Sequence, residues 1–98
     1  MTPRLFLRPV ARAELAEAFR WYEERSTGSG HEFVRAVRIG LAAIERAPEQ
    51  FPIAVDDIRR ARPRRFPYLI FFVVSAESIS DLAVMQGRRD PRRWQARR

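Results

Sequence analysis

The sequence predicts an α+β fold in which a strand and two helices precede a mainly antiparallel sheet of three or four strands. Three features support this: a strand-like hairpin over residues 68–86, amphipathic helical patterns over residues 10–25 and 31–47, and a glycine-containing loop between those two patterns. Two amphipathic helices joined by a short loop form an αα-hairpin, which needs a surface for its apolar stripes. The sheet supplies that surface, so both helices are expected on one of its faces.

The hairpin is the element around which the chain is organised. Residues 68–74 form an unbroken run of Leu, β-branched and aromatic residues, and the polar residues 75–78 can turn the chain. In the second strand, alternation predicts one face with Ile79, Asp81, Ala83 and Met85 and another with Ser80, Leu82, Val84 and Gln86. Neither face is purely polar, so we expect a central position in the sheet.

The two helices are predicted from apolar residues that recur every three or four positions. The buried stripe of the first is expected to contain Ala11, Leu15, Ala18, Phe19 and Tyr22. The buried stripe of the second is expected to contain Phe33, Val37, Gly40, Leu41 and Ile44. Residues 26–30 separate the helices and hold two glycines that can adopt positive φ.

Shorter strands complete the prediction. Residues 4–7 are apolar and lie between Pro3 and Pro9, which suits a first or edge strand. A further strand is expected at residues 53–55 or 58–61, beside a turn at Asp56 and Asp57. It would join the hairpin from the side.

The composition indicates one domain over residues 1–98, with a basic tail at residues 88–98. The chain has no Cys and one His, so we expect no disulfide, no metal site and no cofactor. No stretch is apolar enough to predict a signal peptide or a membrane span. A cytoplasmic protein is therefore expected.

The basic residues, all of them Arg, are concentrated in the second half of the chain. Residues 1–58 hold eight Arg and nine acids, a net charge of −1, whereas residues 59–98 hold eleven Arg and three acids, a net charge of +8. Such a field attracts RNA, DNA or an acidic protein segment alike. The alternative is that these arginines are ordinary solvated surface.

Few side chains are suited to acid–base chemistry near neutral pH. His31 stands at the start of the second helix and is expected to be a surface or capping residue, and Tyr68 a core residue whose hydroxyl reaches the surface. The first-helix acids, expected on its solvated side, are Glu14, Glu17, Glu23 and Glu24. Trp94 stands among arginines and would either pin the tail to the sheet or contact a partner.

Several short motifs, in this order, resemble the ParE branch of the RelE/ParE toxin superfamily. They are W-Y-E-E-R at residues 21–25, the glycine loop followed by E-F, P-x-x-F-P at 48–52, R-R-F-P-Y at 64–68 and G-R-R-D-P-x-x-W at 87–94. The resemblance spans nearly the whole chain and implies a small α+β bacterial toxin of a type II toxin–antitoxin system. A cognate antitoxin would bind and neutralise it, forming a hetero-oligomer.

The resemblance also separates two branches of function. RelE-like members cut messenger RNA on the ribosome and typically carry a basic residue near the position of Leu69, an Arg at Arg89 and a Tyr or His near Trp94. A typical relative also has His near Gln86. Of these positions only Arg89 matches, and Tyr68 is a further weak catalytic candidate. The resemblance therefore favours a ParE-like toxin that inhibits DNA gyrase by binding it.

The residues expected to contact the target or the antitoxin are Arg64, Arg65, Arg88, Arg89, Arg93 and Trp94. The alternatives are a ribosome-dependent endoribonuclease and an inactive, orphaned basic interaction module.

Overall fold

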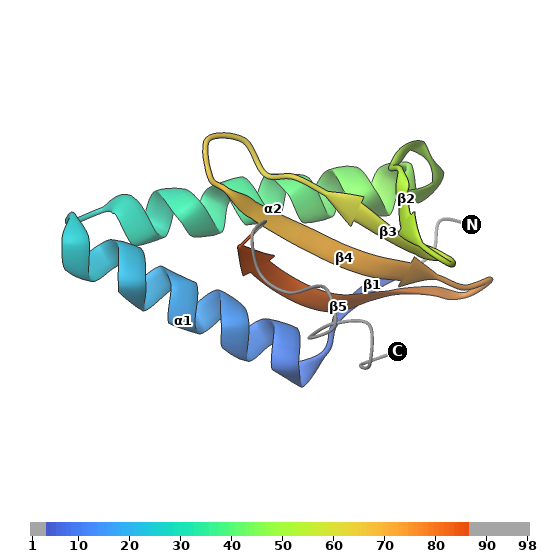
Figure 1. Ribbon diagram of the computed structural model, residues 1–98, viewed down its shortest axis with the longest axis horizontal. Helices are drawn as coiled ribbons and strands as arrows, with labels where there is room; N and C mark the ends of the chain where they lie inside the picture. The colour runs from blue at the N-terminus through green and yellow to red at the C-terminus, as the bar shows by residue number, and fades with distance from the viewer. Residues whose placement is uncertain (1–3, 87–98) are drawn as a thin grey trace.

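The computed structural model describes residues 4–86, which form one mixed sheet with two helices packed on it (Figure 1). The strands are β1 (Arg4–Leu7), β2 (Ile53–Val55), β3 (Ile58–Ala61), β4 (Tyr68–Val74) and β5 (Ser78–Gln86). The helices are α1 (Pro9–Arg25), α2 (Ser29–Arg46) and a short 3-10 helix, η1 (Pro48–Gln50). The predicted α+β class is confirmed.

The sheet has the order β1-β5-β4-β3-β2, so the predicted hairpin of β4 and β5 does lie at its centre. All neighbouring strands are antiparallel except β1, which pairs with β5 in parallel. The sheet has five strands rather than three or four, because residues 53–55 and 58–61 both form strands. They pair with each other around the turn at Asp56 and Asp57.

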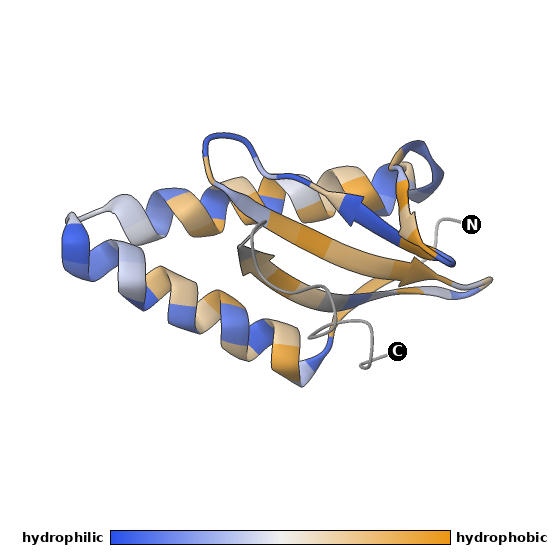
Figure 2. Ribbon diagram, viewed as in Figure 1, coloured by the Kyte–Doolittle hydropathy of each residue, from blue (hydrophilic) through white to orange (hydrophobic). Residues whose placement is uncertain are grey.

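The main core lies between the helices and one face of the sheet. The α2 side chains Phe33, Val37 and Ile44 are buried there as predicted, against Ile70 and Phe72 of β4. Figure 2 shows β4 as a mostly apolar ribbon and both helices with mixed hydropathy. This burial of apolar area is the dominant favourable term in folding.

A second apolar cluster lies on the opposite face of the sheet, and its buried members are Ile58, Phe71, Ala83 and Met85. Ala83 and Met85 therefore do not share a face with Ile79, which belongs to the main core. The simple alternation predicted for residues 79–86 is wrong because β5 contains an irregularity. Phe72 pairs with Asp81 and Phe71 with Ala83, so one extra residue of β5 shifts all later side chains to the other face.

The loop between α1 and α2 uses its glycines differently from the prediction. Gly28 has a φ of +91°, in the left-handed region that favours glycine. Gly30, by contrast, lies inside α2, where an added Cβ would be 2.6 Å from the Phe19 carbonyl oxygen. Gly28 therefore makes the turn, and Gly30 lets the two helices approach each other.

Candidate functional site

The candidate site is centred on the loop of residues 62–67 between β3 and β4. Phe66 anchors this loop, because its ring packs edge-on against Tyr22 of α1 and Phe33 of α2 at centroid distances of 5.1 and 5.3 Å. Arg64 and Arg65, both predicted contact residues, are exposed beyond this anchor. Arg65 has a φ of 72°, a sparsely populated backbone conformation for a residue other than glycine.

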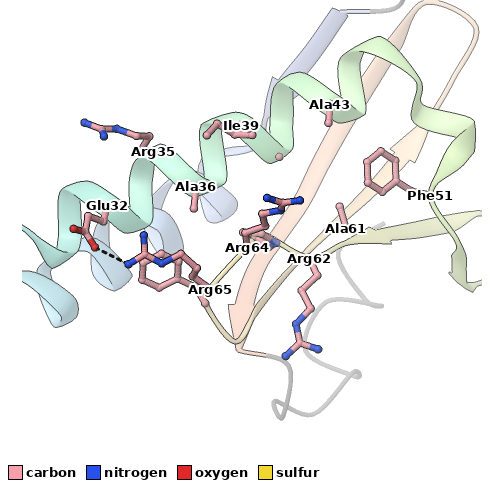
Figure 3. Close-up of a pocket in the computed structure, with 13 residues that line it drawn as sticks. Glu32, Arg35, Ala36, Ile39, Ala43, Phe51, Ala61, Arg62, Arg64 and Arg65 are labelled. Carbon is pink, nitrogen blue, oxygen red and sulfur yellow. Dashed lines mark hydrogen bonds and ion pairs between the residues drawn. The ribbon is translucent and has the colours of Figure 1, made fainter.

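Between this loop and α2 lies a groove of about 420 Å³. Its wall on α2 includes Ala36, Ile39 and Ala43, which face Ala61 and Phe51 across the groove (Figure 3). A large apolar side chain normally avoids water, yet Ile39 is 64% exposed. The groove therefore presents accessible apolar surface.

The far end of the groove is held in place by hydrogen bonds from β3. The Arg59 guanidinium donates to the backbone carbonyl of Phe51 at 2.6 Å and to that of Glu49 at 3.3 Å. The Phe51 ring packs edge-on against Phe72 with a centroid distance of 5.8 Å. These contacts fix Phe51 as a rigid part of the groove lining.

Arginines dominate the rim of the groove. Arg65 lies 3.5 Å from the Glu32 carboxylate, and both side chains are largely exposed, so this pair contributes about 0–1 kcal/mol. Among the residues that the structure describes, the lining arginines Arg35, Arg62 and Arg64 have no ion-pair partner. Figure 3 shows Arg62 extending away from α2. The rim therefore carries a surplus of positive charge suited to carboxylates or phosphates.

The ionisable side chains of the described groove lining are four arginines and one glutamate. Neither His nor Tyr is among the described lining residues. Tyr68 is 9% exposed and lies in the main core, with its ring 4.9 Å from that of Phe33. His31 is exposed at the start of α2, where its ring packs edge-on against Phe19. Within residues 4–86, no group of three or more His, Asp or Glu side chains could hold a metal ion.

The structure describes only some of the predicted contact residues. Arg64 and Arg65 line the groove together. The other predicted contact residues, Arg88, Arg89, Arg93 and Trp94, lie outside the described residues.

Sequence reasoning missed the contribution of α2 to the groove. Arg35 and Ile39 lie off the predicted buried stripe of this helix, and Phe51 follows η1 in an irregular segment. One signal was present in the sequence: Ile39 is a large apolar residue on the expected polar side of the helix. Such a residue indicates either a second packing contact or an exposed binding surface.

Two acids expected on the solvated side of α1 make specific hydrogen bonds. Glu23 accepts from the backbone N–H groups of Gly28 at 2.8 Å and Gly30 at 2.9 Å. These bonds, the Gly28 one first, hold the pKa of Glu23 below its ordinary value. Glu14 accepts from the Val84 N–H of β5 at 3.0 Å. Both side chains remain partly exposed, and the prediction missed their hydrogen bonds because the helix period does not reveal nearby unpaired N–H groups.

A third carboxyl, Asp81, is fully buried beside this contact. Its Oδ1 accepts from the Ala83 N–H at 3.2 Å, while its Oδ2 has no hydrogen-bond partner among the described residues. Burial, followed by the nearby negative charge of Glu14, raises the pKa of Asp81 to about 8.

Comparison with solved structures identifies the fold. The chain resembles a chain of the "Chromosomal ParDE TA system from P. aeruginosa", with a TM-score of 0.77 and 18% identity over 87% of this chain and 96% of that chain. The resemblance to the ParE branch seen in the sequence is thereby confirmed at the level of the fold. No family model matches the sequence, and no match was found among curated proteins. None of the helices within residues 4–86 is long and apolar enough to cross a membrane.

Proposed function

We propose that this protein is the toxin of a type II toxin–antitoxin system, that it inhibits DNA gyrase by binding it, and that a cognate antitoxin neutralises it. Its fold is shared with a chain of a ParDE TA system, in which TA denotes a toxin–antitoxin pair. The proposal places the protein in the cytoplasm of a bacterium. It assigns the groove and its arginines to contacts with the antitoxin or the target.

The observation that carries this proposal is the charge and shape of the groove. Four arginines and one glutamate surround an apolar lining that includes the exposed Ile39. This arrangement suits an acidic amphipathic segment, whose apolar residues would cover Ile39 and Phe51 while its carboxylates meet Arg35 and Arg64. An antitoxin with an acidic helical region has this chemistry, and its binding would cover the surface.

The composition of the groove also favours a binding toxin over a ribonuclease. Cutting RNA by acid–base chemistry requires groups that give and take protons, and in the described groove lining Glu32 is the only side chain suited to that role. A binding toxin needs no such groups. The proposed contact surface further includes Arg88, Arg89, Arg93 and Trp94 of the tail.

The first experiment is a gyrase supercoiling assay with the purified protein, run beside a translation reaction with the same preparation. We expect inhibited supercoiling, with cleaved DNA trapped, and intact translation. Cut messenger RNA with normal supercoiling would instead support the ribonuclease alternative. Unaffected reactions, together with normal growth of cells that express the protein, would support the inactive interaction module.

Charge reversal in the groove tests its role. We expect Arg64→Glu to weaken binding of the antitoxin, or of gyrase, by about tenfold or more, because it places a carboxylate opposite an acidic partner. The matched control is Arg38→Glu, which makes the same charge change at an exposed position of α2 outside the groove lining. Calorimetric titration measures both affinities, and equal weakening by the two variants would contradict a specific role for the groove.

A further inference from the structure

A buried carboxyl group, that of Asp81, and a half-buried one, that of Glu14, lie where α1 meets the central sheet. Asp81 lies in β5 at the irregularity, where Phe72 is its neighbour on β4 and Leu7 its neighbour on β1. Beyond it, the N–H groups of Ala83 and Val84 both donate to carboxyl oxygens, those of Asp81 and Glu14 respectively. The Glu14 bond crosses from β5 to α1, whereas the Asp81 bond stays within β5, so two acids occupy adjacent backbone donors at the seam between α1 and β5.

This arrangement is unfavourable when both acids are ionised. Asp81 is 0% exposed, its Oδ2 has no hydrogen-bond partner within the described chain, and the nearby charge of Glu14 repels it. A buried carboxylate without a cation is costly, and a neighbouring carboxylate increases the cost. Protonation of Asp81 removes the repulsion and leaves Oδ1 available to accept from Ala83.

Among the described residues, the interactions that shift the pKa of Asp81 include no side-chain cation. On α1 the charged group that faces it is Glu14. On β4 its partner is the apolar Phe72, and next to β1 the backbone N–H of Arg8 donates to the Asp81 carbonyl at 3.2 Å. Burial and the charge of Glu14 both act against ionisation of Asp81.

We propose that Asp81 and Glu14 form a proton-linked latch between β5 and α1, closed when Asp81 is protonated and loosened when it ionises. Neither Asp81 nor Glu14 lines the groove. Because α1 also packs against α2, which forms one wall of the groove, the latch would make the helical layer sensitive to pH. Its physical signal is a stability that falls as pH rises through the neutral range.

The direction of the pH dependence follows from the linkage between proton binding and folding. The pKa of Asp81 is raised from 3.8 in the unfolded chain to about 8 in the folded protein, so the folded state binds the proton more tightly. The contribution of Asp81 to stability is therefore largest below about pH 4, falls as pH rises, and levels off above about pH 8. Within this window, Asp81 alone changes the unfolding equilibrium constant by about tenfold per pH unit.

The test compares urea denaturation of the full chain between pH 5 and pH 9 for wild type, Asp81→Asn and Asp56→Asn. We expect Asp81→Asn to remove most of the fall in stability between pH 5 and pH 8. Asp56→Asn makes the same chemical change in an exposed turn, where Asn tolerates the φ of 51°, and should retain the fall. Parallel pH profiles for wild type and Asp81→Asn would overturn the latch.

A second measurement needs no change at Asp81 and keeps the proposal testable if Asp81→Asn folds poorly. The carboxyl carbon of Asp81, followed by NMR in wild type, should titrate near pH 8, and in Glu14→Gln its midpoint should move lower. The substituted amide keeps an oxygen for the Val84 N–H while removing the charge. A wild-type midpoint near pH 4, or an unchanged midpoint in Glu14→Gln, would overturn the proposed coupling.

Loosening of the latch has its own readout in amide hydrogen exchange. Protection factors at Ala83 and Val84 should fall about tenfold or more between pH 6 and pH 9 in wild type, relative to those of Phe33 and Val37 in α2. Asp81→Asn should abolish this difference. A uniform change across β5 and α2, or none at all, would show that ionisation of Asp81 does not act on this seam.

Discussion

Helix α1 is tied to the rest of the molecule near both ends, and in both places a backbone N–H donates to one of its glutamates. At its C-terminal end, Glu23 accepts from two donors, Gly28 and Gly30, and its own pKa is lowered. In its N-terminal half, the Glu14 contact lies beside Asp81, a buried carboxyl with one donor and a raised pKa. The same kind of bond thus accompanies opposite pKa shifts.

The difference shows which physical effect prevails at each place. Glu23 lies at the surface of the interhelical turn, so two N–H donors outweigh the small cost of burial. Asp81 lies under α1, where loss of hydration and a like charge outweigh a single donor. Glu23 therefore stabilises the fold above mildly acidic pH. By contrast, the stabilising contribution of Asp81 is lost toward alkaline pH.

The largest expected effect comes from the core next to Asp81. Phe72→Ala should destabilise the protein by about 3–5 kcal/mol, because Phe72 is fully buried and its loss leaves a cavity. Phe71→Ala, on the other face of β4, should cost a similar amount, as Phe71 is 5% exposed. Urea denaturation measures both, and a loss below about 1 kcal/mol would contradict the burial.

These two variants also test whether Phe72 shields Asp81 from water. Phe72 pairs with Asp81, so its removal lets water approach that carboxyl and should lower the pKa of Asp81. Phe71→Ala should leave that pKa unchanged. Identical pH profiles for the two variants would show that Phe72 does not shield Asp81.

An intermediate effect is expected at the other end of α1. Gly30→Ala should destabilise by about 1–3 kcal/mol, because the added Cβ would lie 2.6 Å from a backbone oxygen of α1 and 2.9 Å from a Glu23 oxygen. The control is Gly40→Ala, whose Cβ would meet Ile70 at an ordinary 3.5 Å. This control should stabilise α2 by up to about 1 kcal/mol in thermal denaturation. Equal effects of the two variants would contradict the close approach at Gly30.

The smallest expected effect is that of Glu23→Gln. A lowered pKa in the folded state means that the carboxylate stabilises the protein above its unfolded value of 4.5, and that this contribution disappears as pH falls through the folded value. Glu23→Gln should therefore flatten the stability profile below about pH 5 and leave the neutral range unchanged. Glu24→Gln, at the exposed neighbouring position, is the control. If Glu23→Gln leaves the fall in stability below about pH 5 unchanged, the Glu23 hydrogen bonds do not have this role.

Much of the fold could be predicted because it rests on local periodicity. The apolar run of residues 68–74 and the stripe of Phe33, Val37 and Ile44 predicted a central strand and a buried helix face. The register of β5 could not be predicted in this way. Its irregularity depends on pairing with β4, and it moved Ala83 and Met85 to the face opposite the helices.

The candidate site was predicted only in part. The arginine cluster before β4 indicated Arg64 and Arg65, since charge is visible in the sequence. The apolar half of the groove combines Ile39 of α2 with Phe51, twelve residues away, and no local pattern links them. Only packing of the helical layer against the β3–β4 loop brings them together.

The sequence by itself determined the secondary structure, the α+β class and the concentration of positive charge after residue 58, because these depend on residue type and spacing. The tertiary structure alone decided which carboxyl groups are solvated and which are buried, since that depends on distant neighbours. Glu14 and Glu23 resemble ordinary surface acids in the sequence, and Asp81 resembles an ordinary strand residue. The hydrogen bonds of Glu14 and Glu23, and the opposite pKa shifts of Glu23 and Asp81, exist only because folding brings α1 against β5 and against the start of α2.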